Sequence, residues 1–126
     1  MAFKKYNAHP KELNVKDCVV RAVCTAFNKD YMETRKELNR AKRELGYSDY
    51  KETKFLYEYL KDYERLKFKG IQGIPRTKVE DFMKSHPKGT YILKVRHHVT
   101  TCVDGDILDS WDCTYLTVYT VWKIKD

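Results

Sequence analysis

The pattern of hydrophobic and polar positions changes once along the chain, near residue 90. Before that point, apolar side chains recur every three or four residues, as on one face of a helix. After it, apolar and polar residues alternate, as in a strand. Helices followed by strands predict an α+β domain in which a central helix packs on a C-terminal antiparallel sheet. The 126 residues fit a single domain that covers residues 1–126.

Four helices are expected. Their predicted ranges are 17–27, 30–45, 53–63 and a short helix that starts at a capping-box pattern over 77–80 and ends before His86. The first helix is apolar on nearly all sides, so we expect it to be central, and either Asn14 or Asp17 can cap it. The second and third are expected to be half-exposed packing elements.

The expected strands cover 66–68, 90–103, 106–111 and 117–124. Asp104-Gly105 is a typical two-residue hairpin turn between the second and third of these strands. That register places Asp109 diagonally opposite His98, with Trp111 on the same face. His97 then falls on the other face, which carries more apolar residues and is predicted to be the buried one. A one-residue bulge would exchange the two faces.

The cysteines show no pattern typical of disulfides or metal sites. The chain has four: Cys18, Cys24, Cys102 and Cys113. None lies in a C-x-x-C pair, and the first residues lack the apolar stretch of a signal peptide, so we expect free thiols in a cytoplasmic protein with no membrane span. Cys102, Cys113 and either His97 or His98 lack the short paired spacings of structural zinc sites. We therefore predict no metal and no other cofactor.

Cys18 is the candidate nucleophile, because it lies at a helix start, where unpaired backbone N–H groups and the macrodipole stabilise a thiolate. Cys24 lies deeper in the same helix and is predicted to be a core residue. His98 can serve as the base, and Asp109 can fix its tautomer and steady the imidazolium. The structural alternative is a buried Cys18 beside an ordinary surface pair of His98 and Asp109.

The order of a Cys on a helix, a His on a strand and a carboxylate on the next strand resembles that of papain-like cysteine peptidases. Asp109-Ser110-Trp111 resembles the Asn-Ser-Trp of papain-type enzymes, in which the tryptophan shields the bond to the histidine. Asp17-Cys18 is similar to the NlpC/P60 branch. The motifs DCVVRAV, HPKGTYILKV and HHVTTCVDGDILDSWDC are similar to those of small papain-like proteins encoded by bacteriophages and bacteria, over about residues 17–113.

This resemblance implies a papain-like fold and a thiol hydrolase that cleaves a peptide or isopeptide bond through Cys18, His98 and Asp109. Its partner would be a protein or peptide, including a host protein in the host cytoplasm if a phage encodes the chain. Papain-type enzymes carry an oxyanion-binding glutamine six residues before the nucleophile, where this chain has Glu12. We expect the oxyanion donors to be the backbone N–H of Cys18 and the side chain of Asn14, with Asp17 capping the helix or orienting the site.

Two other classes of function stay open at this point. The formal net charge is +7 and the chain has ten tyrosines, which suits a non-catalytic phage or bacterial protein that inhibits a host factor through a basic, tyrosine-rich surface. The third class is sequence-tolerant nucleic-acid binding. It is disfavoured because glutamates are mixed among the basic residues of the second helix and no nucleic-acid-binding motif is present.

Overall fold

The computed structural model describes residues 2–13, 16–68, 72–73 and 75–126. In that part of the chain the elements are β1 (Phe3–Lys5), α1 (Cys18–Phe27), α2 (Tyr31–Leu45), α3 (Thr53–Tyr59), β2 (Glu64–Lys67), α4 (Val79–Ser85), β3 (Thr90–Val95), β4 (His98–Val103), β5 (Asp106–Asp109) and β6 (Val118–Lys125). The predicted α+β class is confirmed: the described residues form four helices and one mixed six-stranded sheet.

The sheet has the strand order β1-β5-β4-β3-β6-β2. All neighbouring pairs are antiparallel except β1 with β5, which is parallel. The sequence pattern did not predict β1, because three residues are too short for alternation to be visible. The expectation of a purely antiparallel sheet was therefore wrong at this one edge.

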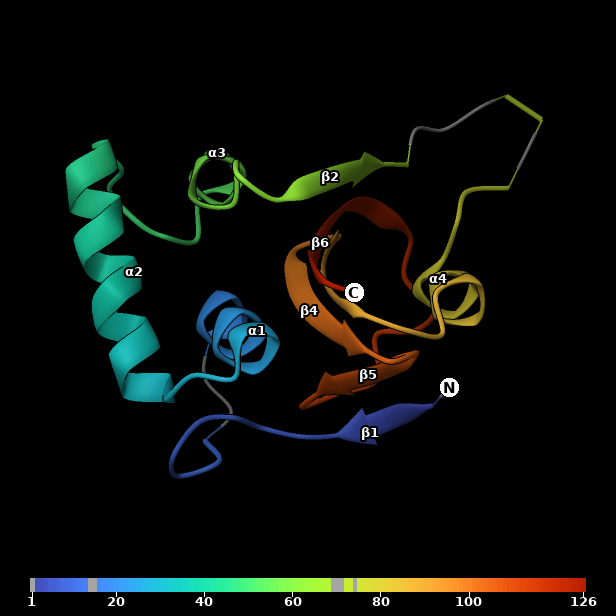
Figure 1. The fold of residues 1–126 in the computed structure, drawn as a ribbon, viewed down its shortest axis with the longest axis horizontal. Helices are drawn as coiled ribbons and strands as arrows, with labels where there is room; N and C mark the ends of the chain where they lie inside the picture. The colour runs from blue at the N-terminus through green and yellow to red at the C-terminus, as the bar shows by residue number, and fades with distance from the viewer. Residues whose placement is uncertain (1, 14–15, 69–71, 74) are drawn as a thin grey trace.

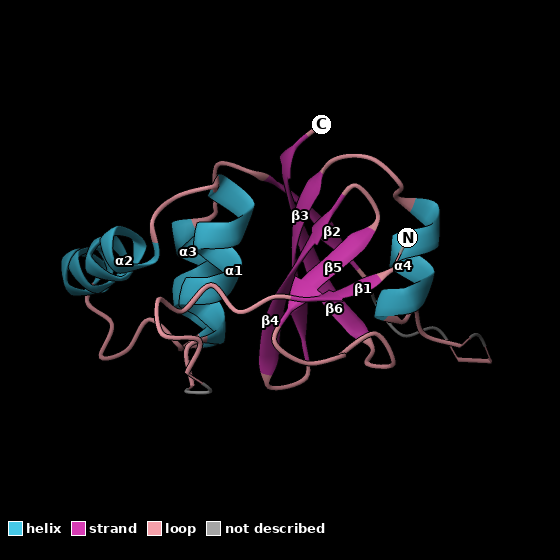
Figure 2. Ribbon diagram, turned by 90° about the horizontal axis from the view of Figure 1, so that it is seen from below, coloured by secondary structure: helices cyan, strands magenta, loops and turns pink. Residues whose placement is uncertain are grey.

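The helices lie on both sides of the sheet (Figures 1 and 2). Helices α1, α2 and α3 lie on one side, with α1 against the sheet and α2 outermost, and α4 lies on the other side. Helix α1 is central as expected, because its fully buried Val20 and Val23 belong to a core with Ile92, Val99 and Trp122 of the sheet. Burial of that apolar face anchors the start of α1 beside the sheet.

Strand 90–103, predicted as one element, is two strands. The chain turns at Arg96 and His97, where His97 adopts a left-handed φ of 54°, and β4 then runs back along β3 with Val95 opposite His98. His97 is exposed in this turn, so its predicted place on the buried face was wrong. Helices cover both faces of the sheet, which explains why alternation along these strands did not identify a single buried face.

Other boundaries moved by a few residues. The start of α2 follows its prediction, because Asp30 accepts a hydrogen bond from the backbone N–H of Glu33. In contrast, α3 ends at Tyr59 rather than Tyr63. The capping box of α4 lies one residue later than predicted, with Lys78 as the N-cap residue. The Asp81 carboxylate accepts a hydrogen bond from the backbone N–H of Lys78. Among the described residues, no helix is long and apolar enough to cross a membrane.

Candidate active site

Cys18 is the first residue of α1, and its thiol lies beside the start of β4. The first backbone hydrogen bond of this helix is from the N–H of Arg21 to the carbonyl of Asp17 at 3.0 Å, so the N–H groups before Arg21 have no acceptor within the helix. Burial raises the pKa of the Cys18 thiol, but a hydrogen bond with His98, the charge of His98 and the backbone N–H of Val99 outweigh it, and the pKa falls below its ordinary 9.0. The site therefore favours a thiolate.

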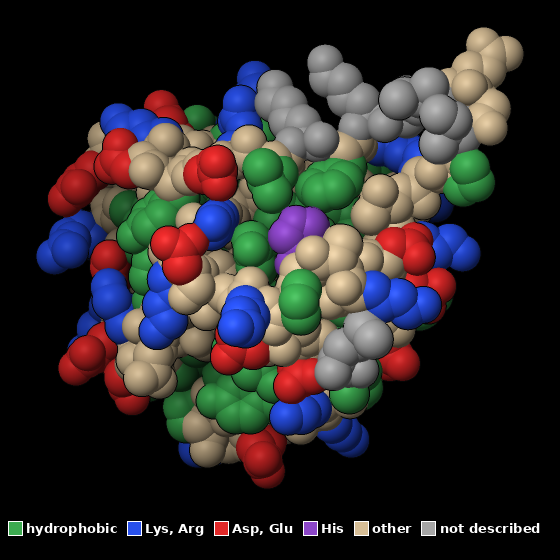
Figure 3. All heavy atoms as spheres, turned by 45° about the vertical axis from the view of Figure 1, so that its right-hand side comes forward, with side chains coloured by type: hydrophobic (Ala, Val, Ile, Leu, Met, Phe, Trp, Pro, Cys, Tyr) green, Lys and Arg blue, Asp and Glu red, His purple; other side chains and the backbone are tan. Residues whose placement is uncertain are grey.

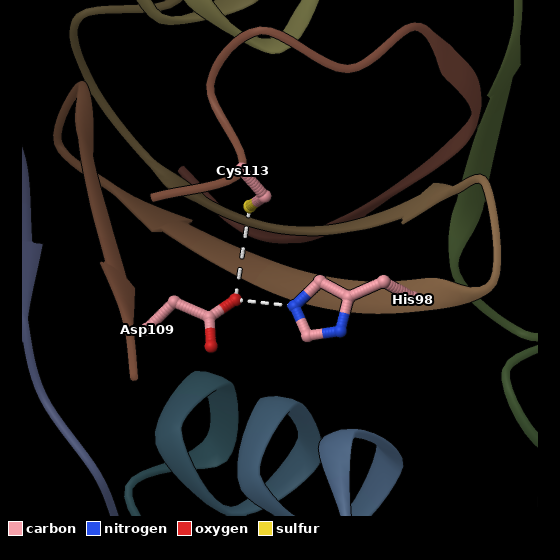
Figure 4. A group of neighbouring side chains, drawn as sticks. All are labelled: His98, Asp109 and Cys113. Carbon is pink, nitrogen blue, oxygen red and sulfur yellow. Dashed lines mark hydrogen bonds and ion pairs between the residues drawn. The ribbon is translucent and has the colours of Figure 1, made fainter. Parts of the chain in front are cut away.

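His98, at the start of β4, is held by Asp109 at the end of β5. The distance between His98 Nε2 and Asp109 Oδ2 is 2.6 Å, both side chains are buried, and Figure 4 shows the carboxylate pointing at the ring. Burial lowers the pKa of His98, but the hydrogen bond with Asp109 dominates and raises it well above 6.5. Burial likewise raises the pKa of Asp109, whereas His98 lowers it below 3.8. The pair favours an imidazolium beside a carboxylate.

The hairpin register explains this contact. Val103 pairs with Asp106 across the Asp104-Gly105 turn, as predicted. Pairing continues to Thr101 with Leu108, so the next residue of β5, Asp109, lies at the level that the sequence register gave it. The predicted contact between Asp109 and His98 is therefore present. Strand β5 ends there, and Trp111 lies in the following loop rather than on the strand.

A buried arginine joins the start of α1 to the His98–Asp109 pair. Arg21 Nη1 lies 2.5 Å from Asp17 Oδ1, and Arg21 Nη2 lies 3.8 Å from Asp109 Oδ1. The hydroxyl of Tyr31 donates to Asp17 Oδ2 at 2.6 Å. Asp17 stands at the N-cap position, but its carboxylate makes no capping hydrogen bond. It is instead half of a buried ion pair, so of the two roles predicted for Asp17, capping the helix or orienting the site, capping by the side chain was wrong.

Trp111 lies against the ring of His98. Its ring centroid lies 4.6 Å from that of His98, with an angle of 45° between the ring planes. Trp111 is 39 % exposed, so part of it meets solvent while its ring contacts the imidazole. The residue predicted to shield the site is thus in contact with His98. Asn14, the second predicted oxyanion donor, lies outside the described residues.

Cys113 is a neighbour that the sequence suggested only as a weak metal candidate. Its Sγ lies 3.8 Å from Asp109 Oδ2, and Figure 4 shows both His98 and Cys113 meeting the same carboxylate oxygen. One ligand atom from each of these three buried residues lies within 4.8 Å of the others, which could hold a metal ion. The direct hydrogen bond at 2.6 Å leaves no space for an ion between Asp109 and His98. This geometry therefore suits an acid–base pair better than a metal site.

The thiol and the imidazole face a cleft of about 600 Å³. Its walls come from the start of α1, the segment leading into α3, the β3–β4 turn and Trp111. A second cleft of about 690 Å³ lies at the other end of α1 and includes Cys24, but neither Cys18 nor His98. Only the first of these two clefts gives a substrate access to the candidate site.

Comparison of the chain with protein-family models, curated proteins and solved structures finds no match. No family is therefore assigned to the chain.

Proposed function

We propose that the protein is a papain-like cysteine hydrolase that cleaves a peptide or isopeptide bond through a thioester on Cys18. The observation that carries this proposal is the arrangement of two side chains that line the cleft, Cys18 and His98, with the buried carboxylate of Asp109 behind His98. Cys18 and His98 line the same cleft, where His98 lowers the pKa of the Cys18 thiol, and His98 Nε2 is 2.6 Å from Asp109 Oδ2. His98 lowers the pKa of Cys18, and Asp109 raises the pKa of His98. Both shifts favour a thiolate and an imidazolium near neutral pH, as catalysis requires.

The chemistry follows from these positions. The Cys18 thiolate attacks the carbonyl carbon, and the carbonyl oxygen becomes an oxyanion near the helix start. The backbone N–H of Cys18 is a donor there, since it has no acceptor within α1. The C–N bond breaks as the His98 imidazolium gives its proton to the leaving amine. Water then attacks the thioester, His98 takes its proton, and the carboxylic acid leaves as the Cys18 thiolate is restored.

Asp109 and Trp111 support His98 in this proposal. Asp109 holds the ring by one nitrogen, which leaves the other nitrogen for the thiol. Trp111 excludes water from one side of the ring, and a hydrogen bond is stronger where water is excluded. The contact between Trp111 and His98 also supports the resemblance of Asp109-Ser110-Trp111 to the Asn-Ser-Trp of papain-type enzymes.

The alternative function is a binding protein whose Cys18 is inert. Reaction with an activated ester distinguishes it from a hydrolase, because only a hydrolase is acylated at Cys18 and then releases the acyl group. We would mix the native protein with p-nitrophenyl acetate and follow the intact mass and the modified peptide. A hydrolase forms one acetyl thioester at Cys18 and releases it with time, and Cys18→Ser forms none. Ser85→Ala is a control that should behave as wild type, because Ser85 is exposed and does not line the cleft. Absence of acetylation at Cys18, or a thioester that never hydrolyses, would overturn the hydrolase proposal.

The nucleic-acid alternative gains no support from the face of the molecule that Figure 3 draws. On the face drawn in Figure 3, basic and acidic side chains are interspersed rather than gathered into a basic patch. Charges interspersed as on this face favour weak, salt-sensitive association without a defined site.

A further inference from the structure

Lys94 stands out among the residues that line the cleft, because it is a partly buried cation that pairs with no carboxylate of the described residues. Its ammonium Nζ donates to the carbonyl of Val95 at 2.9 Å, and it makes no ion pair with any described residue. Burial lowers the pKa of the Lys94 ammonium from 10.5, while the Cys18 thiolate acts in the opposite direction. A charged group removed from water in this way is stabilised by an opposite charge.

The sheet register brings Lys94 close to the nucleophile. Lys94 on β3 lies directly opposite Val99 on β4, and the backbone N–H of Val99 is one of the groups that lower the pKa of the Cys18 thiol. Directly opposite residues of an antiparallel pair share a face and lie roughly 5 Å apart. Lys94 therefore projects from the α1 side of the sheet, one strand away from the reacting sulfur.

The two acidic residues of the cleft, Asp17 and Glu52, already have partners within the protein. Asp17 is paired with Arg21 and Tyr31. Glu52 Oε2 accepts hydrogen bonds from the backbone N–H groups of Ser48 and Asp49 at 3.0 Å and 3.2 Å. Two further lysines of the cleft, Lys16 and Lys51, are exposed. The cleft thus carries positive charge that its own carboxylates do not neutralise.

We propose that this cleft selects a substrate that carries a carboxylate close to the scissile bond, bound by Lys94 with Lys16 and Lys51 at the rim. This inference rests on the proposed function, since it names the substrate class of that same site. In a peptide the carboxylate is either an acidic side chain or a free C-terminus. Both present the same acceptor to an ammonium group.

Three alkylating probes separate these sources, each with the same reacting carbon. They are iodoacetyl-glutamine amide, which is neutral, iodoacetyl-glutamate amide, which has a side-chain carboxylate, and iodoacetyl-glutamine, which has a terminal carboxylate. In each case the Cys18 thiolate forms a C–S bond as iodide leaves. The measured quantity is the ratio of the Cys18 alkylation rate for each acidic probe to that for the neutral probe.

We expect one acidic probe to react on the order of fivefold faster than the neutral probe, as an ion pair at a partly exposed site allows. High salt should reduce that ratio. Lys94→Met and Lys94→Gln should bring it to about one, and Lys94→Glu should invert it. Lys88→Met is the matched control, because Lys88 is exposed and does not line the cleft, and its ratio should equal that of wild type.

The outcomes distinguish the two proposals. If Cys18 reacts readily with the neutral probe but shows no preference for either acidic probe, the carboxylate inference is overturned and the hydrolase proposal stands. A preference that persists in both Lys94→Met and Lys94→Gln overturns the assignment to Lys94. If Cys18 reacts with no probe while the protein is folded, the hydrolase proposal itself fails.

Discussion

Cys18 and Cys24 lie on the same helix, roughly 9 Å apart along its axis, yet their surroundings shift their pKa values in opposite directions. Burial raises the pKa of both thiols. At Cys18, His98 outweighs burial and the pKa falls below 9.0. At Cys24, burial prevails and the pKa rises, and its thiol donates to the carbonyl of Arg21 at 3.4 Å. His98 is therefore the main cause of the difference between the pKa values of these two thiols.

The largest expected effect comes from Arg21, which lies between the two cysteines on α1. Arg21→Met removes the cation from between two buried carboxylates, Asp17 and Asp109. Leaving a buried charge without its partner costs about 3–5 kcal/mol, and we expect that loss in the free energy of unfolding measured with urea. Arg21→Lys keeps the charge without the planar fork and should recover part of the loss.

The matched control for Arg21 is Arg40→Met on α2, whose side chain is 67 % exposed. A surface substitution of this kind should change the free energy of unfolding by about 0.5 kcal/mol or less. A cost for Arg21→Met as small as that of Arg40→Met would mean that the ion network does not stabilise the fold.

Removal of the imidazole should abolish the difference between the two thiols. In His98→Ala the largest groups that lower the pKa of Cys18 are gone, and burial outweighs the backbone N–H of Val99 and the charge of Arg21, so the pKa should rise above 9.0. The rate of iodoacetamide labelling at neutral pH should then fall about 100-fold, as measured by peptide mass spectrometry. The wild-type labelling profile should rise at a pH below 9.0 and the variant profile above it, while Cys24 stays protected in both.

His97→Asn is the control for this change, because His97 is exposed and asparagine tolerates its left-handed backbone. It should keep the labelling rate of wild type. Equal labelling of Cys18 in His98→Ala and wild type would show that the imidazole does not activate the thiol.

Asp109→Asn should reduce the difference in labelling between Cys18 and Cys24 without abolishing it. Asparagine can keep a hydrogen bond to His98, but the negative charge that stabilises the imidazolium is lost. The Cys18 labelling rate near neutral pH should fall roughly tenfold, since a loss of about 1.4 kcal/mol of charge stabilisation corresponds to that factor. Asp112→Asn is the control, because Asp112 is exposed and accepts its hydrogen bonds from Thr114. A wild-type rate in Asp109→Asn would remove Asp109 from the proposed triad.

The sequence predicted the elements that short-range patterns determine. The range of α1, the ends of α2 and the Asp104-Gly105 register follow from periodicity, caps and turn chemistry, and this register is what brought Asp109 to His98. The turn at residues 96–97 was missed because neither residue is a glycine or proline, and no sequence pattern predicts the left-handed conformation of His97.

The surroundings of the site depended on long-range contacts. Four residues separate Asp17 from Arg21, a spacing at which opposite charges pair on a helix, but the approach of Arg21 to Asp109 requires the packing of α1 on β5. Tyr31 reaches Asp17 from a different helix, and Cys113 reaches Asp109 from a loop. No spacing in the sequence encodes such contacts, and only the tertiary fold shows them.

The smallest expected effect is that of Trp111, which touches the imidazole but carries no charge. Trp111→Ala opens one side of His98 to water, and water weakens both the bond to Asp109 and the interaction with the thiolate. Because Trp111 is already 39 % exposed, we expect only a two- to threefold fall in Cys18 labelling, roughly 0.5 kcal/mol. Tyr115→Ala, a more exposed aromatic in the same loop, should have no effect. If both variants label at the wild-type rate, the bond between His98 and Asp109 keeps its strength without the indole, and burial by α1 alone protects it.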